Sequence, residues 1–367
     1  MRYICGYIKS IALVGVLTFL VVVESLGAQE TIDQLFGDDL VADGLYFDGE
    51  TSFDEETGAL TFLTSGLIQN PKLKARYAQY EKNADLPLDS WYNVFIVPAR
   101  VKRIIIGEDV TITGRFVIDH DCVVEGKNRK KSVIYGTSQT RYSHNRGEEY
   151  GENWDAPWKY SSIDVVGSAT VYVKNLTVLN PYGYCISGYA KGAVLHCQSV
   201  DMIDSRGGDQ NNSDGFIGQA GSSLTDVYIE TADDAVKAYH DLTMTNVEIV
   251  MLKNGAPVQF GWNADDNEDS KVVVCGLVVR TRDGVDRYNR GVFSWVSEDN
   301  TKVVCVTAND VVIDAPNAYL FEMNPSVGTA NIAITNASIK TKGEGVNKTK
   351  GAVTVSARLP LKGTCDD

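Results

Sequence analysis

The chain has 367 residues, of which 44% are hydrophobic and 22% are charged. This composition is typical of a globular protein with a substantial core, arranged as one large domain or two. The formal net charge of −14 argues against general binding to nucleic acid or to an anionic membrane surface. Glycine outnumbers proline, with 33 residues against 9, which favours a fold with many turns.

Residues 1–28 have the features of a secretory signal peptide. Arg2 and Lys9 supply a positive region, and residues 11–23 form an apolar run of 13 residues that ends shortly before small residues at 25–28. The run is shorter than the roughly 20 residues that a membrane span needs, and an uncleaved anchor is the alternative. We therefore expect a secreted protein, extracellular or periplasmic, with no membrane attachment after cleavage.

Six cysteines follow the signal segment. In an exported protein they are candidates for disulfide bonds, and the sequence alone does not choose among their many possible pairings. Their spacing lacks the close pairs of a structural zinc site, and we expect neither a metal nor a cofactor. The six are Cys122, Cys185, Cys197, Cys275, Cys305 and Cys365.

Residues 29–90 differ from the rest of the chain. They are rich in acidic side chains, as in FGDDLVADGLYFDGETSFDEETG from Phe36, and KLKARYAQYEKNAD from Lys72 could form a short helix. A stacked fold must cover the open end of its core. We predict that residues 29–90 are an N-terminal lead-in or cap and that residues 91–367 form the main domain.

Beyond residue 90 the chain repeats one kind of segment. Each repeat joins a small or polar residue to a short strand in which apolar residues alternate, as in KNLTVLN from Lys174 and TDVYIET from Thr225. Successive repeats are 24, 27, 20, 30, 34 and 26 residues apart, a step that is typical of a solenoid. The equivalent small or polar residues are Asn175, Ser199, Asp226, Asn246, Gly276, Asp310 and Asn336.

Short strands, many turns and this repeat length predict an all-β fold, a single-stranded right-handed parallel β-helix. Each turn of the chain forms one coil, and successive coils stack strand on strand about 4.8 Å apart. Inward apolar side chains then form a continuous core. A β-sandwich is the alternative, but its strands recur every 8–12 residues, which is shorter than the repeat found here.

The segment NNSDGFIGQAGSSLTDVYIETADDAVKAYH, from Asn211, holds a lone aspartate and an adjacent pair. Asp214 precedes the pair of Asp233 and Asp234 by 19 residues (233 − 214), which is about one coil, so we expect the three carboxylates on neighbouring coils. Such a cluster is costly unless it has a purpose. One purpose is glycoside hydrolysis, in which a carboxylic acid protonates the leaving oxygen and a carboxylate activates water.

The adjacent pair raises a geometric question. Neighbouring residues on a regular strand face opposite ways. Asp233 and Asp234 can therefore both enter one cleft only where the strand ends or bulges. The alternative is that one of them caps a turn and only the other is exposed.

Three sequence blocks resemble motifs of a known family. NSDG from Asn212, ADDAVKAYH from Ala232 and GAPVQFGW from Gly255 are similar, in order and spacing, to motifs of the dextranase and isopullulanase family of glycoside hydrolases, and Thr281 and Arg282 fall where that family has Thr-Arg. The resemblance covers about residues 160–290. It implies a β-helix that hydrolyses internal bonds of a polysaccharide with inversion and without a metal.

The resemblance also implies roles for individual residues. Asp233 would be the general acid, and Asp214 with Asp234 would be the base that positions water. Lys237 would hold a carboxylate in its charged form or bind sugar hydroxyls, and its alternative is a solvated surface lysine. The other residues that would line the cleft are Tyr239, Gln259, Trp262 and Arg282.

Aromatic and basic side chains add to the expected cleft. The segment from Gly147 to Ser162 holds Trp154 and Trp158, which would form either a carbohydrate platform or a lid packed on the scaffold. Trp262 would stack on a sugar ring or pack in the core. The arginines between 280 and 290 would suit an anionic or sulfated sugar if they face the cleft, and otherwise they are solvated loop charges.

Several other functions stay open at this point. Polygalacturonases share the lone and the doubled aspartate, but the Gly-His-Gly and Arg-Ile-Lys motifs that they also need are absent here. A sulfated-galactan hydrolase would use the same carboxylates. A calcium-dependent polysaccharide lyase would use the aspartates as calcium ligands, and a secreted β-helix could bind glycans without cutting them.

A dextranase-like hydrolase, acting as a monomer, is the favoured prediction. Dextran-cutting members of the family carry a sizeable β-sandwich before the β-helix. Residues 31–90 are too short for such a domain. The substrate therefore stays open within the class of polysaccharides.

Overall fold

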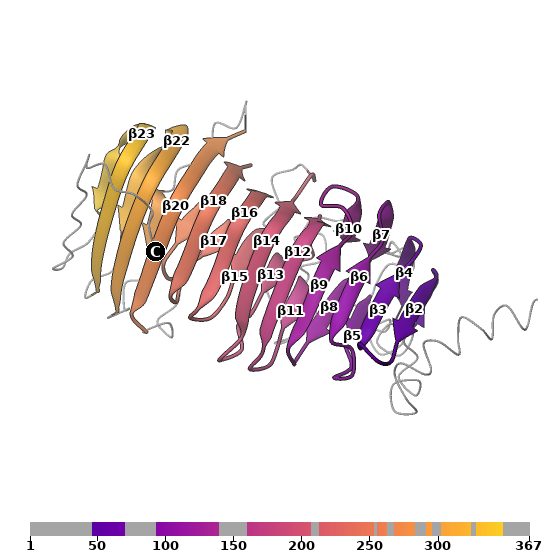
Figure 1. Cartoon of the computed structure of the whole chain (residues 1–367). Coiled ribbons are helices and arrows are strands. Elements are labelled where there is room, and N and C mark those ends of the chain that lie inside the picture. Colours follow the sequence, from indigo (N-terminus) through magenta and orange to yellow (C-terminus); the bar gives the residue numbers. More distant parts are fainter. Residues whose placement is uncertain are drawn as a thin grey trace, which may run out of the picture.

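The computed structural model describes residues 46–69, 93–138, 160–206, 213–252, 255–262, 268–282, 291–295, 302–323 and 328–347. In these ranges the chain forms strands β1 to β23 and no helix. The strands stack coil on coil along one axis, from β2 and β3 at one end to β22 and β23 at the other (Figure 1). The predicted right-handed parallel β-helix is confirmed. None of the described residues forms a helix with the length and apolarity that crossing a membrane requires.

Each coil presents three faces. The first face begins with β3 (Ala59–Phe62), β6 (Arg103–Ile106) and β9 (Cys122–Gly126), and the second with β4 (Gly66–Gln69), β7 (Val110–Thr113) and β10 (Ser132–Tyr135). The third face consists of β5 (Val94–Ile96), β8 (Arg115–Ile118), β11 (Ser161–Val165), β13 (Tyr184–Ser187), β15 (Asp214–Ile217), β17 (Val236–Lys237), β19 (Val258–Gln259) and β21 (Gly291–Trp295).

Long strands connect the faces in the later coils. They bend from the first face to the second, and the last two continue onto the third face. These strands are β12 (Thr170–Leu179), β14 (Val194–Ile203), β16 (Ser222–Thr231), β18 (Leu242–Met251), β20 (Ser270–Thr281), β22 (Val303–Met323) and β23 (Thr329–Asn347).

A residue in the left-handed conformation makes the bend between the first and second faces. Asn175 has a φ of 52°, Asp226 of 53° and Asn246 of 52°. Asn and Asp tolerate this region because their short side chains hydrogen-bond locally. All seven equivalent positions of the sequence repeat have a positive φ, and the residues beside them pair in register from coil to coil. The repeat seen in the sequence is therefore the corner of each coil.

The inward side chains form one continuous core. On the third face Phe116, Ile163, Ile186, Phe216 and Val236 stack on one another from coil to coil, and all are buried. Complete burial of such a side chain contributes about 1.5–3 kcal/mol, so this stack is a principal source of stability. Because alternate residues of a strand point to opposite sides, the outward positions of the same strands can carry polar groups.

The N-terminal end of the stack has a different pairing. The strands β1 (Tyr46–Phe47) and β2 (Thr51–Asp54) pair antiparallel with β4 and β3, whereas β3 and β4 stack in parallel on β6 and β7. An added antiparallel strand protects a sheet edge from further pairing, as a cap would. The stack thus reaches back to Ala59, before residue 91 where we placed the start of the main domain. Residues 29–45 and 70–90 lie outside the described residues, so the extent of the cap stays a prediction.

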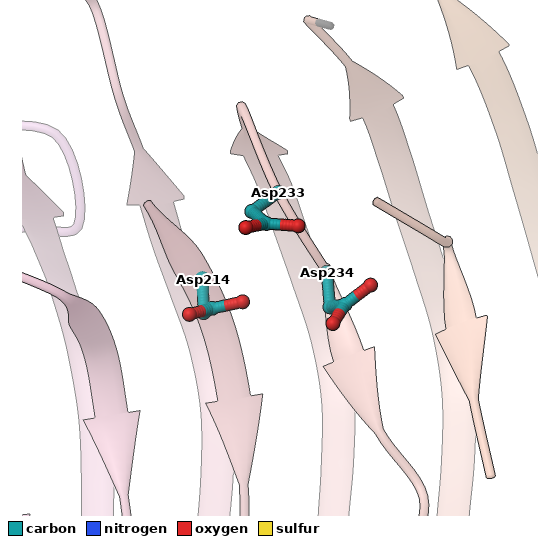
Figure 2. A group of neighbouring side chains, drawn as sticks. All are labelled: Asp214, Asp233 and Asp234. Carbon is teal, nitrogen blue, oxygen red and sulfur yellow. The ribbon is translucent and has the colours of Figure 1, made fainter. Parts of the chain in front are cut away.

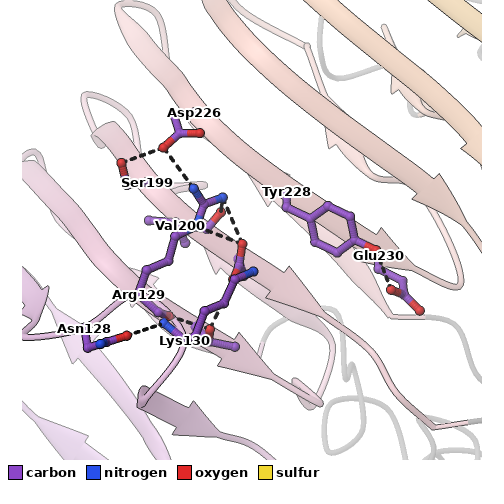
Figure 3. Close-up of polar contacts among 10 residues, drawn as sticks. Asn128, Arg129, Lys130, Ser199, Val200, Asp226, Tyr228 and Glu230 are labelled. Carbon is purple, nitrogen blue, oxygen red and sulfur yellow. Dashed lines mark hydrogen bonds and ion pairs between the residues drawn. The ribbon is translucent and has the colours of Figure 1, made fainter. Parts of the chain in front are cut away.

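The segment between β9 and β10 reaches over the second face and joins later coils (Figure 3). Arg129 donates hydrogen bonds of 2.9 Å to Asp201 and 2.9 Å to Asp226, and Lys130 donates one of 2.5 Å to Asp201. The Asp201 side chain is fully buried. Removing its cationic partners would leave a buried, uncompensated charge, so these contacts help to hold β10, β14 and β16 in register.

Most of the described cysteines are not paired as disulfides. Cys122, Cys185, Cys197 and Cys305 are free thiols, and the first three are buried. The expectation of disulfides is wrong for these four. The three buried thiols serve as small apolar core side chains, whereas the Cys305 thiol is exposed. Burial raises the pKa of the Cys122 thiol to about 12, which makes it unreactive. Cys275 is disulfide-bonded.

Replacing Asn246 by valine is expected to lower the free energy of unfolding by about 1–2 kcal/mol, because a side chain with a branched Cβ clashes in the left-handed conformation. Asn246→Gly should have little effect, since glycine has no Cβ to clash. Urea unfolding followed by circular dichroism measures both. The control is Thr243→Val at an exposed position of β18, which should change stability by less than about 0.5 kcal/mol. Equal losses at both positions would contradict the role of the corner.

Candidate active site

The three aspartates lie where neighbouring third-face strands begin. Asp214 is the first residue of β15, and Asp233 with Asp234 lies between the end of β16 at Thr231 and the start of β17 at Val236. Because the pair stands in a connection, strand alternation does not force its side chains apart. Both members therefore reach one cluster, which answers the geometric question that the sequence raised.

Hydrogen bonds between coils fix the aspartates. The Asp233 N–H donates to the Ser213 carbonyl at 2.9 Å, and the Gly215 N–H donates to the Asp234 carbonyl at 3.0 Å. The Asp234 Oδ1 accepts a charge-assisted hydrogen bond of 2.8 Å from the Ala256 N–H. The position of each carboxylate thus depends on the stacking of the coil before it or after it.

The three carboxylates form a compact cluster (Figure 2). Three carboxylate oxygens, one from each aspartate, all lie within 4.8 Å of one another. Asp214 and Asp234 are only 1% and 4% exposed, whereas Asp233 is exposed to an intermediate degree. Buried carboxylates at this distance repel one another and lose hydration. The cluster therefore needs a compensating positive charge.

Lys237 supplies that charge. Its Nζ lies 3.5 Å from Asp214 Oδ1 and 3.5 Å from Asp234 Oδ2. Burial alone lowers the pKa of the Lys237 ammonium, but Asp214, Tyr239 and Asp234 hold that pKa well above its usual value. The lysine is thus a charged group enclosed in the cluster, and it is not a solvated surface lysine.

The same lysine bears on metal binding. Three carboxylates at this spacing could in principle bind a divalent cation through their oxygens. The Lys237 ammonium already lies beside two of them, and it would repel a second cation at short range. The arrangement favours proton chemistry over a metal centre.

Tyrosine and glutamine side chains surround the lysine. Tyr184 accepts a hydrogen bond from Lys237 Nζ, and Tyr239 donates one to Gln259 Oε1. Gln259 pairs in register with Lys237 on the next coil, so two of the predicted cleft residues lie beside the cluster. Burial raises the pKa of Tyr184 and of Tyr239 well above the usual range, so both hydroxyls stay neutral.

Gly255 allows the next coil to lie against the aspartate pair. It has a φ of +78°, and a Cβ at this position would lie 2.3 Å from the Asp233 carbonyl carbon and 2.4 Å from the Asp234 nitrogen. Any side chain would therefore both strain the backbone and push the aspartate pair away. A glycine is required here by the site.

Trp262, Arg282, Trp154 and Trp158 complete the set of residues predicted to line the cleft. Trp262 is 48% exposed and so is not packed in the core. Arg282 forms an ion pair with Glu230, which lies at the end of the second face. Trp154 and Trp158 lie outside the described residues, and their part in the cleft stays a prediction.

The contacts of the arginines between 280 and 290 give less support to an anionic substrate than their presence in the sequence did. Arg280 pairs with Glu248 and Arg282 pairs with Glu230. These two guanidinium groups are therefore engaged with carboxylates of the chain itself. The later arginines of the run lie outside the described residues.

Tyr184 and Gly255 were not recognised as site residues from the sequence. Tyr184 pairs in register with Asp214, although 30 residues separate them (214 − 184). Aligning YCIS with DGFI as strands of successive coils would have brought Tyr184 to the cluster. Gly255 opens the block GAPVQFGW, but only its φ shows why a glycine is needed.

Comparison with known proteins agrees with the fold and the motifs. No family model matches the chain. A dextranase from Arthrobacter sp. (strain CB-8) is 21% identical over 305 residues, which cover 78% of this chain and 47% of the dextranase. An isopullulanase from Aspergillus niger is 28% identical over 167 residues, which cover 39% of this chain and 29% of the isopullulanase. The chain is similar, at low identity, to these members of the dextranase and isopullulanase family.

The relationship extends over most of the described β-helix. The chain spans about half the length of the curated dextranases that it matches. Among solved structures, Dex49A from Penicillium minioluteum has a TM-score of 0.50 at 14% identity and covers 72% of this chain and 49% of that chain. This likeness shows that the chain shares the fold of Dex49A.

Gly255→Ala is expected to displace the aspartate pair and to lower kcat/KM roughly 10²-fold, the loss that a misplacement of about 1 Å can cause. Reducing-sugar release from dextran, pullulan, polygalacturonate, alginate and carrageenans, together with thermal unfolding, measures the effect. Gly343→Ala is the matched control, because a Cβ there would meet its nearest neighbour at 3.8 Å, an ordinary contact. Full activity in Gly255→Ala would show that the pair does not need this close approach.

Proposed function

We propose that the protein is a secreted glycoside hydrolase that cuts internal bonds of a polysaccharide. The observation that carries the proposal is the cluster of three carboxylates around the buried Lys237 ammonium. A carboxylic acid beside ionised carboxylates is the chemical equipment of glycoside hydrolysis. The kinship with a dextranase and an isopullulanase, as those relatives are named, supports the same reaction class.

The contacts of the lysine support a division of roles. Lys237 contacts Asp214 and Asp234, and a neighbouring cation favours the charged form of a carboxylate. These two side chains would act as the base that holds water and accepts its proton. Asp233, the more exposed member, would be the acid. It would give its proton to the glycosidic oxygen as the bond from that oxygen to the anomeric carbon breaks and water attacks the same carbon.

An α-glucan such as dextran is the first substrate to test. Trp262, which is exposed, offers a ring on which a sugar could stack, and Gln259 and Tyr239 would contribute polar groups near the cluster. The calcium-dependent lyase is less favoured, because the Lys237 ammonium would compete with a bound cation. A monomeric, secreted enzyme without affinity for nucleic acid stays our prediction.

Asp233→Asn is expected to lower kcat by roughly 10²–10⁴-fold, because the leaving oxygen would lose its proton donor. Reducing-sugar release from dextran, pullulan, polygalacturonate, alginate and carrageenans, with and without EDTA, measures this. Asp214→Asn and Asp234→Asn should also be strongly impaired. The control is Asp314→Asn, since Asp314 forms an exposed ion pair with Lys340, and such pairs contribute little.

The possible outcomes of this assay separate the candidate functions. Release that survives EDTA and collapses in Asp233→Asn supports the hydrolase. Release that EDTA abolishes and Asp233→Asn retains, with new absorbance from an unsaturated sugar, would replace it by the lyase. Binding to a glycan without any release would instead assign a binding protein.

Inversion at the anomeric carbon is the expected stereochemistry, and ¹H NMR of the first product formed measures it. The expectation comes from the resemblance to the family and not from the carboxylate spacing. The oxygen separations within 4.8 Å are shorter than the roughly 6.5–9.5 Å between carboxyl groups in most inverting enzymes. Two carboxylates that hold one water together can act at this shorter range. A first product with the configuration of the substrate would assign a covalent intermediate on one aspartate.

A further inference from the structure

Tyr184 is a buried third-face residue that directly contacts the charged centre of the cluster. It is fully buried and pairs in register with Asp214 on the next coil. Its hydroxyl accepts a hydrogen bond from the Lys237 ammonium and lies 2.6 Å from the hydroxyl of Tyr189. The roles that we assigned to the aspartates and to Lys237 do not account for this tyrosine.

The direction of one hydrogen bond at Tyr184 is determined by its neighbour Lys237. An ammonium group has three donors and no acceptor, so the Tyr184 oxygen must accept from Lys237. Tyr184 stays neutral because burial raises its pKa well above the usual range. Its own proton is then available for the hydroxyl of Tyr189, which is 48% exposed. The contacts form a chain from the carboxylates through Lys237 and Tyr184 to the surface.

A lysine side chain has four flexible carbons and about 2 kcal/mol of rotamer entropy. Two carboxylate contacts of 3.5 Å are longer than a normal N–H···O hydrogen bond of 2.7–3.2 Å. The hydrogen bond to Tyr184 is the closest contact of this ammonium among the described residues. The tyrosine therefore determines where the positive charge lies relative to both carboxylates.

Among the described residues, the groups that surround the Lys237 ammonium come from the third face and its connections. The ring of Tyr184 also lies under the charge, with Lys237 Nζ 4.9 Å from the ring centroid. Gln259 is the neighbour on β19 and does not titrate. The titratable groups that face Lys237 are Asp214 from β15, Asp234 before β17, Tyr239 after β17, and Tyr184 and Tyr189 from β13 and the turn after it.

We propose that Tyr184 is a positioning residue for the hydrolysis: it fixes the Lys237 ammonium between Asp214 and Asp234 and so keeps a positive charge beside both carboxylates of the proposed base. The inference rests on the proposed function. Tyr184 acts through Lys237 and does not itself touch the reacting atoms. A merely structural tyrosine would affect folding without changing how the rate depends on pH.

The test is the pH profile of kcat/KM for Tyr184→Phe, measured on the best substrate of the glycan panel. The acidic limb of the profile should move to higher pH by about 1 unit, the lower end of the effect of a neighbouring opposite charge. KM should change little, and kcat at the optimum should fall roughly 10-fold. Tyr172→Phe is the matched control. It removes the same hydroxyl from an exposed tyrosine on the first face and should leave the profile unchanged.

A double mutant tests whether Tyr184 acts through the lysine. If it does, Lys237→Met and Lys237→Met/Tyr184→Phe should have the same acidic limb, because coupled residues are not additive. Additive shifts in the double mutant would overturn the proposal. An unchanged acidic limb in Tyr184→Phe would also overturn it, as would a loss of activity that merely follows a loss of folded protein in circular dichroism.

A second readout does not need activity. Acylation of Lys237 by a small amine-reactive reagent, followed by peptide mass spectrometry, reports how firmly the ammonium is held. Tyr184→Phe should be acylated several-fold faster than Tyr172→Phe, and equal rates would overturn the positioning role. If the wild type cuts no glycan of the panel, the proposed hydrolase fails while the acylation result still decides the Tyr184–Lys237 contact.

Discussion

In-register parallel stacking is the constraint on which the rest of the structure depends. It brings residues that are one coil apart in sequence to about 4.8 Å apart in space. Tyr184 and Asp214 become neighbours in this way, as do Lys237 and Gln259. The left-handed corner residues keep each bend at the same place, so the register on the first and second faces carries through to the third. A site assembled from several coils is thus as precise as the stacking itself.

The same constraint explains how the chain tolerates three clustered carboxylates. A charge cluster of this kind would drive a flexible loop apart, because like charges repel and buried ones lose hydration. Here interstrand hydrogen bonds hold the backbone of Asp233 and Asp234, and the core beneath them is fully packed. Lys237 then offsets part of the negative charge from within. The stacked apolar core therefore supplies the stability that offsets the repulsion among the three carboxylates.

Much of this could be predicted from the sequence, because the signals were local and repeated. The corner positions were read from Asn, Ser, Asp and Gly before alternating strands, since few residues tolerate a positive φ. The aspartates were found because their spacing equals one coil. Tyr184 was missed because coil length varies from 20 to 34 residues, so the partner of a given residue cannot be counted off. The cysteines were misjudged because export permits disulfides but does not require them, and a packed core uses a thiol equally well.

The contacts of the cluster suggest which parts of the chain are free to diverge. A corner needs only a residue that accepts the left-handed backbone, and four residue types fill the seven equivalent positions. The cluster needs particular charges at particular distances, and Gly255 next to it admits no side chain at all. Trp262 and Arg282 lie outside the contacts that hold Lys237 between the carboxylates. Changes at such margins can alter which ligand is bound while the three aspartates and the lysine keep their geometry. Under the proposed function, a chain that is only 21% identical to a dextranase over 78% of its length can share the reaction class of that enzyme and differ in substrate.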